Sequence, residues 1–215
     1  MSKFNNKNIY FREIESKDYK DIEKIISDTW GYEKLSSNPV NAKRMARLYL
    51  RSCLTVQTFT RVAIHDGQVI GIIMARSEKD FKHPKLSYSI KQLYAYLLVN
   101  LTKEGRKICR MYKGIDKIDE ELLEATGQKF DGELVFFALD KKARGLGIGK
   151  HLLNLAKDYM LSNNMNNFYL YTDVSCNYEF YENQGFSRIG EKQYTLKPKY
   201  NFDFLFFIYK YNLKV

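Results

Sequence analysis

The hexapeptide Arg144-Gly145-Leu146-Gly147-Ile148-Gly149 lies between an apolar run and an amphipathic segment. The run before it, residues 133–139 with the sequence ELVFFAL, predicts a buried strand. Apolar residues after it recur at helical spacing as far as Met160, so we expect a helix that begins near Gly147. A strand, a glycine-rich turn and a helix start present free backbone N–H groups and the positive end of a helix dipole to an anion. This segment therefore predicts a phosphate-binding loop.

The spacing of the glycines excludes two common phosphate loops. The dinucleotide fingerprint needs a further glycine where Lys150 stands, and the Walker loop needs Ser or Thr where His151 stands. What fits is an Arg, two free positions, a Gly, one free position and a second Gly. This pattern resembles the coenzyme A loop of the GNAT superfamily of N-acetyltransferases.

A second stretch, downstream of the loop, extends the resemblance. Residues 168–173 predict a short strand, which is followed by Asn177, by Phe-Tyr-Glu at residues 180–182, and by Gly185-Phe186. This order is similar to the next strand and helix of the GNAT superfamily, with Gly185 expected to end the helix in a left-handed conformation. Because two motifs occur in the right order, about one helix and one strand apart, the chain is identified as a GNAT-type acetyltransferase domain.

The resemblance implies a binding site for acetyl-CoA. In this family the N–H groups of the loop hold the pyrophosphate, and the preceding strand pairs with the pantetheine arm. Arg144 is expected to brace the loop, and Lys150 to lie near phosphate oxygens. Backbone N–H groups near the end of the strand would polarise the thioester carbonyl. The predicted contacts are Ala138, Leu139, Arg144, Gly145, Leu146, Gly147, Ile148, Gly149, Lys150 and Asn177, although Asn177 could equally be the N-cap of the next helix.

The same resemblance implies two catalytic roles. Tyr181 occupies the position of the tyrosine that, in many relatives, protonates the departing coenzyme A sulfur, but a chain with 17 tyrosines also offers a packing role for it. Glu133 stands where relatives often carry the carboxylate that removes the proton of the amine. Asp173, at the end of the next strand, and water are its rivals. We reject Cys176 as an acyl carrier, because no histidine accompanies it and direct attack is the family norm.

Composition is that of one folded domain, residues 1–215. Hydrophobic residues make up 45% of the chain, and no apolar run approaches the ~20 residues that span a bilayer. Residues 1–6 lack the apolar core of a signal peptide, and three cysteines form no metal spacing, so we expect a cytoplasmic protein with neither a metal nor a membrane contact. The formal charge of +10 invites a nucleic-acid partner, but acidic residues are interleaved with the basic ones throughout, which disfavours that interpretation.

The remaining elements follow the order of the family. Strand patterns cover residues 9–13, 58–64 and 69–75, and Asp66-Gly67 is a strong hairpin signal between the last two. Between the first two strands we expect a helix capped by Ser16 and ended by Gly31, and a second helix over residues 41–54. The aromatic run at residues 202–211 predicts a last strand.

The departure from the family is residues 77–131, which separate the third strand from the fourth. Two helical patterns occur in this insertion, the second of them stopped by Gly127. Because an apolar stripe must pack on something, we expect the insertion to pack on the domain, where it covers the acceptor site, contacts a second subunit or decorates the surface. The stripe of the first helix consists of Ile90, Leu93, Tyr94, Leu97, Leu98 and Leu101.

The sequence thus predicts the α/β (α+β) GNAT fold, with a mixed central sheet of about seven strands flanked by helices and a helical insertion between strands 3 and 4. The implied activity is transfer of the acetyl group of acetyl-CoA to a primary amine of a small molecule, peptide or protein, by direct attack in a ternary complex. The alternative is a degenerate domain that binds coenzyme A or another protein without catalysis. Neither the acceptor nor the oligomeric state, with a homodimer as one option, follows from the sequence.

Overall fold

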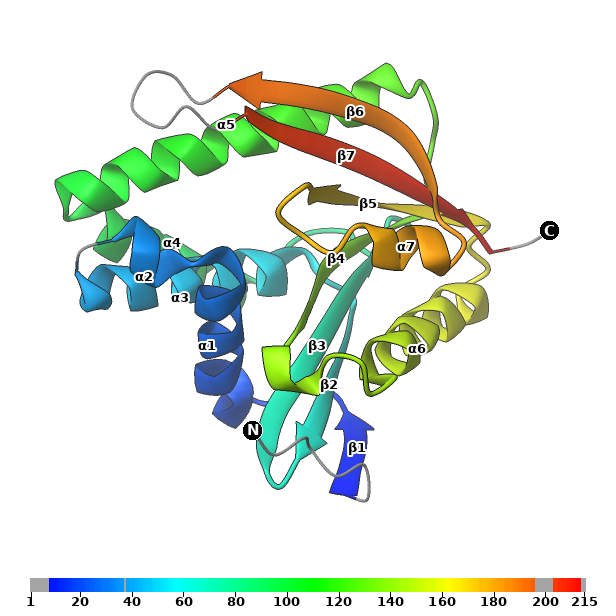
Figure 1. Ribbon diagram of the computed structural model, residues 1–215, viewed down its shortest axis with the longest axis horizontal. Coiled ribbons are helices and arrows are strands. Elements are labelled where there is room, and N and C mark those ends of the chain that lie inside the picture. The colour runs from blue at the N-terminus through cyan, green and yellow to red at the C-terminus, as the bar shows by residue number, and fades with distance from the viewer. Residues whose placement is uncertain (1–7, 37, 196–202, 214–215) are drawn as a thin grey trace.

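The computed structural model describes residues 8–36, 38–195 and 203–213. Within them the chain forms a seven-stranded sheet with helices on both faces (Figure 1). The strands are β1 (Ile9–Arg12), β2 (Phe59–His65), β3 (Gln68–Ser77), β4 (Gly132–Leu139), β5 (Asn167–Asp173), β6 (Ser187–Thr195) and β7 (Asp203–Asn212), in the order β1-β2-β3-β4-β5-β7-β6. The helices are α1 (Tyr19–Trp30), α2 (Tyr32–Leu35), α3 (Pro39–Val56), α4 (Leu86–Asn100), α5 (Lys103–Ala125), α6 (Ile148–Ser162) and α7 (Glu179–Asn183), with 3-10 turns η2 (Ser16–Asp18) and η3 (Lys141–Ala143).

The predicted mixed sheet is confirmed, and apolar layers cover both of its faces. β4 and β5 are the parallel pair, and the other neighbouring strands are antiparallel. On one face α1 and α3 bury Ile22 and Leu50 against Ile72 of β3. On the other face α6 buries Leu152 against Ile73, the next residue of the same strand. Side chains that alternate between two buried faces explain why β3 is an almost continuous apolar run.

A bulge in β4 opens the sheet. The register with β3 shifts between Met74 and Ala75, which makes Val135 the extra residue on β4. A bulge bends the strand that contains it and increases its twist. β4 and β5 accordingly pair over only two residues, the second being Glu133 opposite Tyr169. Beyond that pair the two strands diverge, so the edge of β4 that faces β5 is left without a strand partner (Figure 1).

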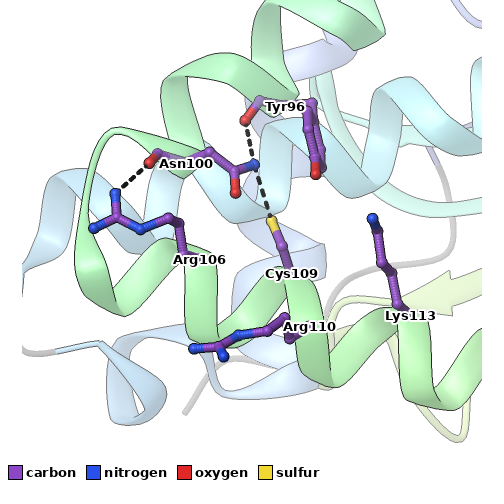
Figure 2. Close-up of a pocket in the computed structure, with 6 residues that line it drawn as sticks. All are labelled: Tyr96, Asn100, Arg106, Cys109, Arg110 and Lys113. Atoms are coloured by element: carbon purple, nitrogen blue, oxygen red, sulfur yellow. Dashed lines mark hydrogen bonds between the residues drawn. The ribbon is translucent and has the colours of Figure 1, made fainter.

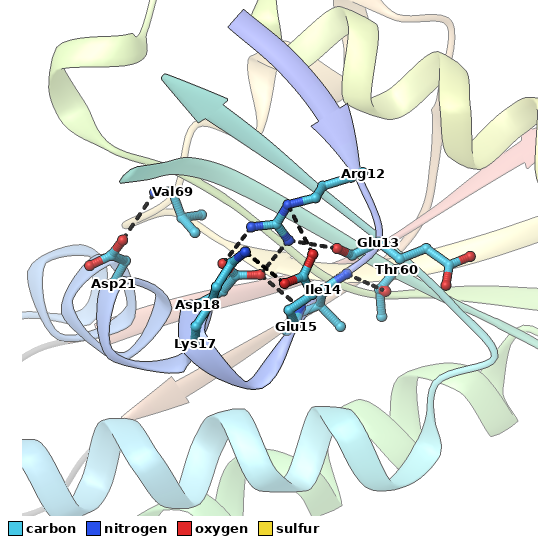
Figure 3. A network of polar contacts seen from close by, with 9 residues as sticks. All are labelled: Arg12, Glu13, Ile14, Glu15, Lys17, Asp18, Asp21, Thr60 and Val69. Atoms are coloured by element: carbon cyan, nitrogen blue, oxygen red, sulfur yellow. Dashed lines mark hydrogen bonds and ion pairs between the residues drawn. The ribbon is translucent and has the colours of Figure 1, made fainter. Parts of the chain in front are cut away.

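A buried carboxylate ties the start of α1 to the sheet. Asp18 accepts two hydrogen bonds from Arg12 of β1, at 2.6 and 2.7 Å, and one from the Glu15 N–H at 2.7 Å (Figure 3). Burial acts to raise the pKa of Asp18, but these hydrogen bonds outweigh it, so that the pKa is lowered. Ser16, the predicted cap, instead lies inside η2, and α1 begins at Tyr19. The predicted cap of Ser16 is therefore replaced by a reciprocal capping box at η2, in which the Glu15 side chain accepts the Asp18 N–H and the Asp18 side chain accepts the Glu15 N–H.

The turns predicted from Gly and Asp are confirmed. Gly31 ends α1 with a φ of 63°, and Gly185 follows α7 with a φ of 86°. Asp66 and Gly67, at φ values of 48° and 78°, join β2 to β3. Two successive residues with positive φ match the right-handed twist of the hairpin that they connect.

The insertion between β3 and β4 forms two helices, but its apolar stripe does not pack as expected. α4 lies against α3, and its buried residues are Ala95 and Val99. The stripe is on the opposite face, where Leu93, for example, is 59% exposed. α5 supplies much of the buried surface of the insertion, since Ile118 and Leu122 pack against β5 and β7. The expectation was therefore wrong for this stripe: α4 packs on the domain through Ala95 and Val99 together with the partly buried Tyr88 and Tyr96.

The last strand lies inside the sheet rather than at its edge. β7 pairs antiparallel with both β5 and β6, so β6 is the edge strand. The strand predicted over residues 202–211 is observed as Asp203–Asn212, and residue 202 lies outside the described residues. No helix of the described residues has both the length and the apolar character needed to cross a membrane.

Candidate active site

The glycine-rich loop has the conformation that an anion-binding loop needs. Gly145 and Gly147 have φ values of 79° and 78°, and a Cβ built on either would meet no atom within 4 Å. The first backbone bond of α6 runs from the His151 N–H to the Gly147 carbonyl at 3.1 Å. The N–H groups that precede His151 at this helix start therefore have no intrahelical partner. The loop offers open space, free donors and the positive end of a helix dipole together.

Gly149 has a different role from the other two glycines. A Cβ there would lie 3.1 Å from Leu139 Cδ1 and 3.4 Å from Phe137 Cζ. Only a residue without a side chain lets the first turn of α6 approach β4 this closely. Gly149 therefore sets the distance between the helix start and the strand.

Positive charge surrounds the loop. Lys141, Lys142, Arg144 and Lys150 are all exposed there. Asp140, the one carboxylate in this stretch, accepts the Lys142 N–H at 2.8 Å and so caps η3. Among the described residues none forms an ion pair or side-chain hydrogen bond with Arg144, so its charge is available to a ligand and a bracing contact stays a prediction. An incoming phosphate group is favoured by these charges.

The edge of β4 that faces the gap carries unpaired backbone groups. The Asp140 N–H donates to the Ile70 carbonyl of β3 at 2.9 Å. Backbone groups alternate along a strand, so the Ala138 N–H also points toward β3, whereas the Leu139 N–H points toward the gap. Of the two residues predicted to polarise a carbonyl, Leu139 is the better oriented.

Tyr181 of α7 lies across the gap from β4. Its ring centroid is 6.4 Å from that of Phe137 and 5.6 Å from that of Phe186. Burial raises the pKa of Tyr181, with a smaller contribution from Cys176, so the phenol keeps its proton at neutral pH. Among the described residues none accepts a hydrogen bond from its hydroxyl. The ring is thus held by packing while the O–H group is available to another acceptor.

Glu133 is buried and already paired. Its Oε2 atom lies 2.9 Å from Arg76 Nη2, and the Tyr169 hydroxyl donates to the same oxygen at 3.3 Å. Burial raises the pKa of Glu133, against the opposing effect of Arg76. A carboxylate that is held by a guanidinium is a poor proton acceptor for a substrate. This pairing weakens Glu133 as the candidate base.

Asp173 and Cys176 form a turn at the end of β5. Asp173 accepts the Ser175 N–H at 2.7 Å and the Ser175 hydroxyl at 2.5 Å, and Cys176 Sγ lies 3.9 Å from its other oxygen. Burial and the nearby Asp173 raise the pKa of the Cys176 thiol. A thiol that resists ionisation is a poor nucleophile, which agrees with its rejection as an acyl carrier.

Asp119 of α5 is a candidate that the sequence reasoning missed. Its Oδ1 atom is buried and has no hydrogen-bond partner among the described residues. Burial, followed by the charges of Asp116, Glu133 and Asp173, raises the pKa of Asp119 to about 8. A carboxyl whose pKa is perturbed by burial and by the charges of neighbouring carboxylates is a candidate for acid–base chemistry. The sequence did contain a signal, since Tyr112, Asp116 and Asp119 recur at helical spacing on one face of α5.

A hydrogen bond between two aromatic hydroxyls joins α5 to the N-terminal helices. The Tyr112 hydroxyl of α5 donates to the Tyr32 hydroxyl of α2 at 2.5 Å. Burial raises the pKa of both phenols, and burial likewise raises that of Tyr49 on α3. The insertion and the N-terminal helices thus meet through neutral hydroxyl groups beside the acidic cluster of Asp116, Asp119, Glu133 and Asp173.

Asn177 is not the N-cap of α7. Its side chain is exposed, and α7 begins at Glu179 with Tyr178 as N-cap and no side-chain cap bond. A contact with the pantetheine arm therefore stays a prediction. Among the described residues no group of three or more His, Cys, Asp or Glu side chains is arranged to hold a metal ion.

Two hollows of the surface lie away from the gap. One, of about 350 Å³, lies between α4 and α5 and is lined by Tyr96, Asn100, Arg106, Cys109, Arg110 and Lys113 (Figure 2). The other, of about 870 Å³, is bounded by the ends of α3 and α6, the start of β2 and the lead into α4. Neither contains the glycine loop, Tyr181 or the acidic cluster.

Comparison with known proteins agrees with this geometry. A family model described as the acetyltransferase (GNAT) family matches residues 19–186. The fold is similar to that of arylalkylamine N-acetyltransferase 2 from Aedes aegypti, with a TM-score of 0.57, 16% identity, and coverage of 98% of this chain and 100% of that chain. It is also similar to the ribosomal-protein-S18-alanine N-acetyltransferase from Escherichia coli, with a TM-score of 0.53, 12% identity, and coverage of 96% and 95%.

A third similar structure is an N-acetyltransferase from Staphylococcus aureus Mu50, with a TM-score of 0.54, 15% identity, and coverage of 96% of this chain and 99% of that chain. No curated protein matches the sequence. At these identities the solved structures show the fold alone, whereas the family match extends from the start of α1 to the end of the Gly185-Phe186 motif. The chain therefore belongs to the GNAT family of acetyltransferases.

Proposed function

We propose that the protein is an N-acetyltransferase that moves the acetyl group of acetyl-CoA to a primary amine within a ternary complex. The observation that carries this proposal is the gap between β4 and β5. It opens directly before the glycine loop, and Tyr181 packs against Phe137 of β4 beside it. The charges of Glu133 on β4 and Asp173 on β5 act on Asp119 of α5, which supports a proton acceptor near the anion site and the proton donor.

Acetyl-CoA would be held at two of its parts, the pyrophosphate and the pantetheine arm. The N–H groups of residues 145–150 suit the pyrophosphate, and Lys141, Lys142, Arg144 and Lys150 supply positive charge around it. The open edge of β4 suits the amide groups of the pantetheine arm, because an unpaired strand edge pairs with any extended chain of amides. The Leu139 N–H is then a donor for the thioester carbonyl, and no side-chain mutation can remove it.

Tyr181 is the proposed acid. When the amine nitrogen bonds to the carbonyl carbon, the carbon–sulfur bond breaks and the sulfur requires a proton. Because the pKa of Tyr181 is raised, the phenol is protonated at neutral pH and can supply it. Its hydroxyl also has no competing acceptor among the described residues.

Asp119 is the proposed base, in preference to Glu133 and Asp173. An amine that is an ammonium ion in water must lose a proton before it can attack. A carboxyl with a pKa of about 8 accepts that proton far better than one with an ordinary pKa. Glu133 is paired with Arg76, and Asp173 is engaged by Ser175, whereas Asp119 Oδ1 has no such partner among the described residues. Asp119 would take one proton from the amine, and Tyr181 would give one to the sulfur.

The acidic cluster also bears on the acceptor. Asp116, Asp119, Glu133 and Asp173 favour a cationic amine over a neutral or acidic molecule. The names of two structural neighbours refer to an arylalkylamine and to an alanine of a ribosomal protein, which share an amine and little else. Similar folds thus take unlike acceptors, and the choice among small amines, peptides and proteins rests on experiment.

The test is the release of free thiol from acetyl-CoA in the presence of polyamines, aminoglycosides, amino acids and basic peptides. We expect turnover with at least one cationic amine and an acetylated amine as the product. Tight binding of acetyl-CoA without turnover on any acceptor would favour the alternative of a coenzyme A-binding module. Absence of binding would reject both.

A further inference from the structure

The outer face of α4 concentrates the exposed apolar surface of the molecule. Eleven large hydrophobic side chains are exposed among the described residues, and six of them belong to α4 and the residue after it, so this surface forms one patch rather than a scatter. We call it the α4 stripe. The stripe consists of Leu86, Ile90, Leu93, Tyr94, Leu97 and Leu101, between 55% and 74% exposed.

The spacing of the stripe is that of a helix-pairing seam. Leu86, Ile90, Leu93 and Leu97 follow one another at intervals of four, three and four residues. With about 100° per residue, the six side chains lie within an arc of roughly 100°. Apolar residues that alternate at three and four form the line along which two helices pack side by side.

The orientation of α4 leaves no way for the stripe to be buried within the same chain. On the inner face Gln92 donates to Ser52 of α3 at 3.1 Å, and Arg44 of α3 donates to the Leu98 carbonyl at 3.3 Å. The turn into α5 is equally tight, because a Cβ on Gly105 would lie 1.9 Å from the Val99 carbonyl oxygen. A rotation of α4 would break these contacts. The partner of the stripe must therefore come from outside the described chain.

The available area matches one side of a stable dimer. If each of the six large side chains offers on the order of 100 Å² of apolar surface, the stripe supplies roughly 600 Å². One partner of a standard interface buries about 800 Å², of which about 65% is apolar at the core, so it needs roughly the same apolar area. One stripe on each of two chains thus meets the requirement.

Charge selects a second copy of this chain as the partner. Each chain carries a net charge of +10, so two copies repel each other. They associate most easily through a surface with few charged side chains. α4 is such a place, because Lys91 is its only charged residue. A membrane surface is a poorer match, since helices that bind one are rich in Lys and Arg on their polar face. The basic residues of the neighbouring hollow, Arg106, Arg110 and Lys113, lie on α5 and not on α4 (Figure 2).

We propose that the protein is a homodimer in which the α4 stripes of two copies pack against each other about a two-fold axis. If the helices run parallel, the α5 basic residues of the two copies fall on opposite sides of the interface and do not oppose one another. Leu93 lies near the middle of the stripe, so it faces its own copy in either a parallel or an antiparallel arrangement.

The test is the molar mass of the full chain in solution, measured by light scattering between about 1 and 100 μM, the range of ordinary homodimers. We expect twice the 25.4 kDa of one chain. Leu93→Glu and Leu97→Glu together should weaken association at least 100-fold, whereas Leu161→Glu, at an exposed leucine of α6, should leave the dimer intact. A monomer at every concentration, or a dimer that the paired substitution leaves unchanged, would overturn the proposal.

A complementation experiment excludes a trivial loss of folding. Leu93→Glu and Leu93→Lys should each be monomeric alone and should form a heterodimer when mixed, because opposite charges then meet at the seam. Failure of the mixture to associate while both variants remain folded would contradict the packing. Binding of the parent protein, as a monomer, to vesicles of phosphatidylcholine and phosphatidylglycerol would reject the second copy as the partner. None of these variants touches the glycine loop, so affinity for acetyl-CoA should be unchanged in all of them.

Discussion

The loop between β4 and α6 and the insertion between β3 and β4 follow different rules. The loop is governed by its own backbone: Gly145 and Gly147 adopt positive φ, and the helix dipole and free N–H groups follow from the start of α6. The insertion depends on its packing partners, because α4 packs on the domain through Ala95, Val99 and two tyrosines and leaves its leucine-rich stripe exposed. The backbone conformation of a loop can thus be predicted from one short stretch of sequence, whereas the side of a helix that packs on the domain cannot.

The two regions nevertheless meet at the same gap. The loop provides the anion site for acetyl-CoA, and α5 of the insertion brings Asp119 near two carboxyl groups: Glu133, in the last residue pair before β4 and β5 diverge, and Asp173, at the end of β5. Changes in the loop should therefore alter binding of acetyl-CoA, and changes in the insertion should alter the proton transfer and the acceptor.

The largest effect is expected from Gly147→Glu. The substitution strains a backbone with a φ of 78° and puts a carboxylate where the pyrophosphate should lie. Affinity for acetyl-CoA, measured by calorimetry, should fall at least 100-fold, since several kcal/mol of charge-assisted hydrogen bonding is lost. Gly127→Glu is the control, because Gly127 also has a positive φ, of 60°, and open space around its Cβ, but lies outside the loop. Equal affinity in the two variants would contradict the loop assignment.

Tyr181→Phe should lower turnover by roughly 10-fold to 10³-fold, because one proton transfer goes unassisted while the thiolate still leaves fairly well. The substitution removes one hydroxyl and little volume, so folding and acetyl-CoA affinity should survive. The loss should shrink for thioesters of more acidic thiols, which need less help to depart. Tyr178→Phe, three residues earlier, controls for the loss of a phenol from the same segment. Parental turnover in Tyr181→Phe would reduce Tyr181 to a packing residue.

Asp119→Asn should lower kcat/KM by about 10-fold to 10²-fold and remove an inflection near pH 8 from its pH profile. The base acts when deprotonated, so the parental rate should rise with pH through the pKa of about 8. Glu120→Gln removes a neighbouring carboxylate from the exposed side of α5 and should leave the profile unchanged. A parental profile in Asp119→Asn would assign the base elsewhere.

The same substitution has an opposite effect on stability. Folding raises the pKa of Asp119 from 3.8 to about 8, so its contribution to stability is fully present below pH 3.8 and is lost as pH rises toward 8. Asparagine carries no charge to be desolvated. We expect Asp119→Asn to unfold at a higher temperature than the parent protein at pH 8 to 9, by a few degrees, and to lose this advantage near pH 4. A lower Tm of Asp119→Asn than of the parent protein at pH 8 to 9 would mean that the Asp119 carboxylate has hydrogen-bond or ion-pair partners in the native state.

Much of the fold followed from the sequence because its signals are local. Gly31, Asp66-Gly67 and Gly185 adopt the positive φ that their positions predicted, and the strands and helices lie close to their expected bounds. Ser16 is not a cap because it lies inside the 3-10 turn η2, which Glu15 and Asp18 cap reciprocally. The position of β7 between β5 and β6 is a long-range pairing for which no local pattern exists.

The site could be predicted from the sequence only where a short motif determines the backbone conformation. The glycine loop and the position of Tyr181 follow from short stretches, and the structure adds the bulge at Val135 that opens the gap beside them. Glu133 looked like a free base because its pairing with Arg76 arises across two strands. Asp119 was overlooked because its burial depends on how α5 lies across the sheet, although its spacing from Tyr112 and Asp116 was visible.

The most direct test of the central claim is backbone hydrogen exchange with and without acetyl-CoA. The account places acetyl-CoA along the open edge of β4 and at the start of α6. Exchange should therefore slow at residues 145–150 and at the Leu139 N–H, while the Ala138 N–H, which points toward β3, should be protected with or without acetyl-CoA. Unchanged exchange at these positions, with protection confined to the basic hollow of Arg106, Arg110 and Lys113, would contradict it.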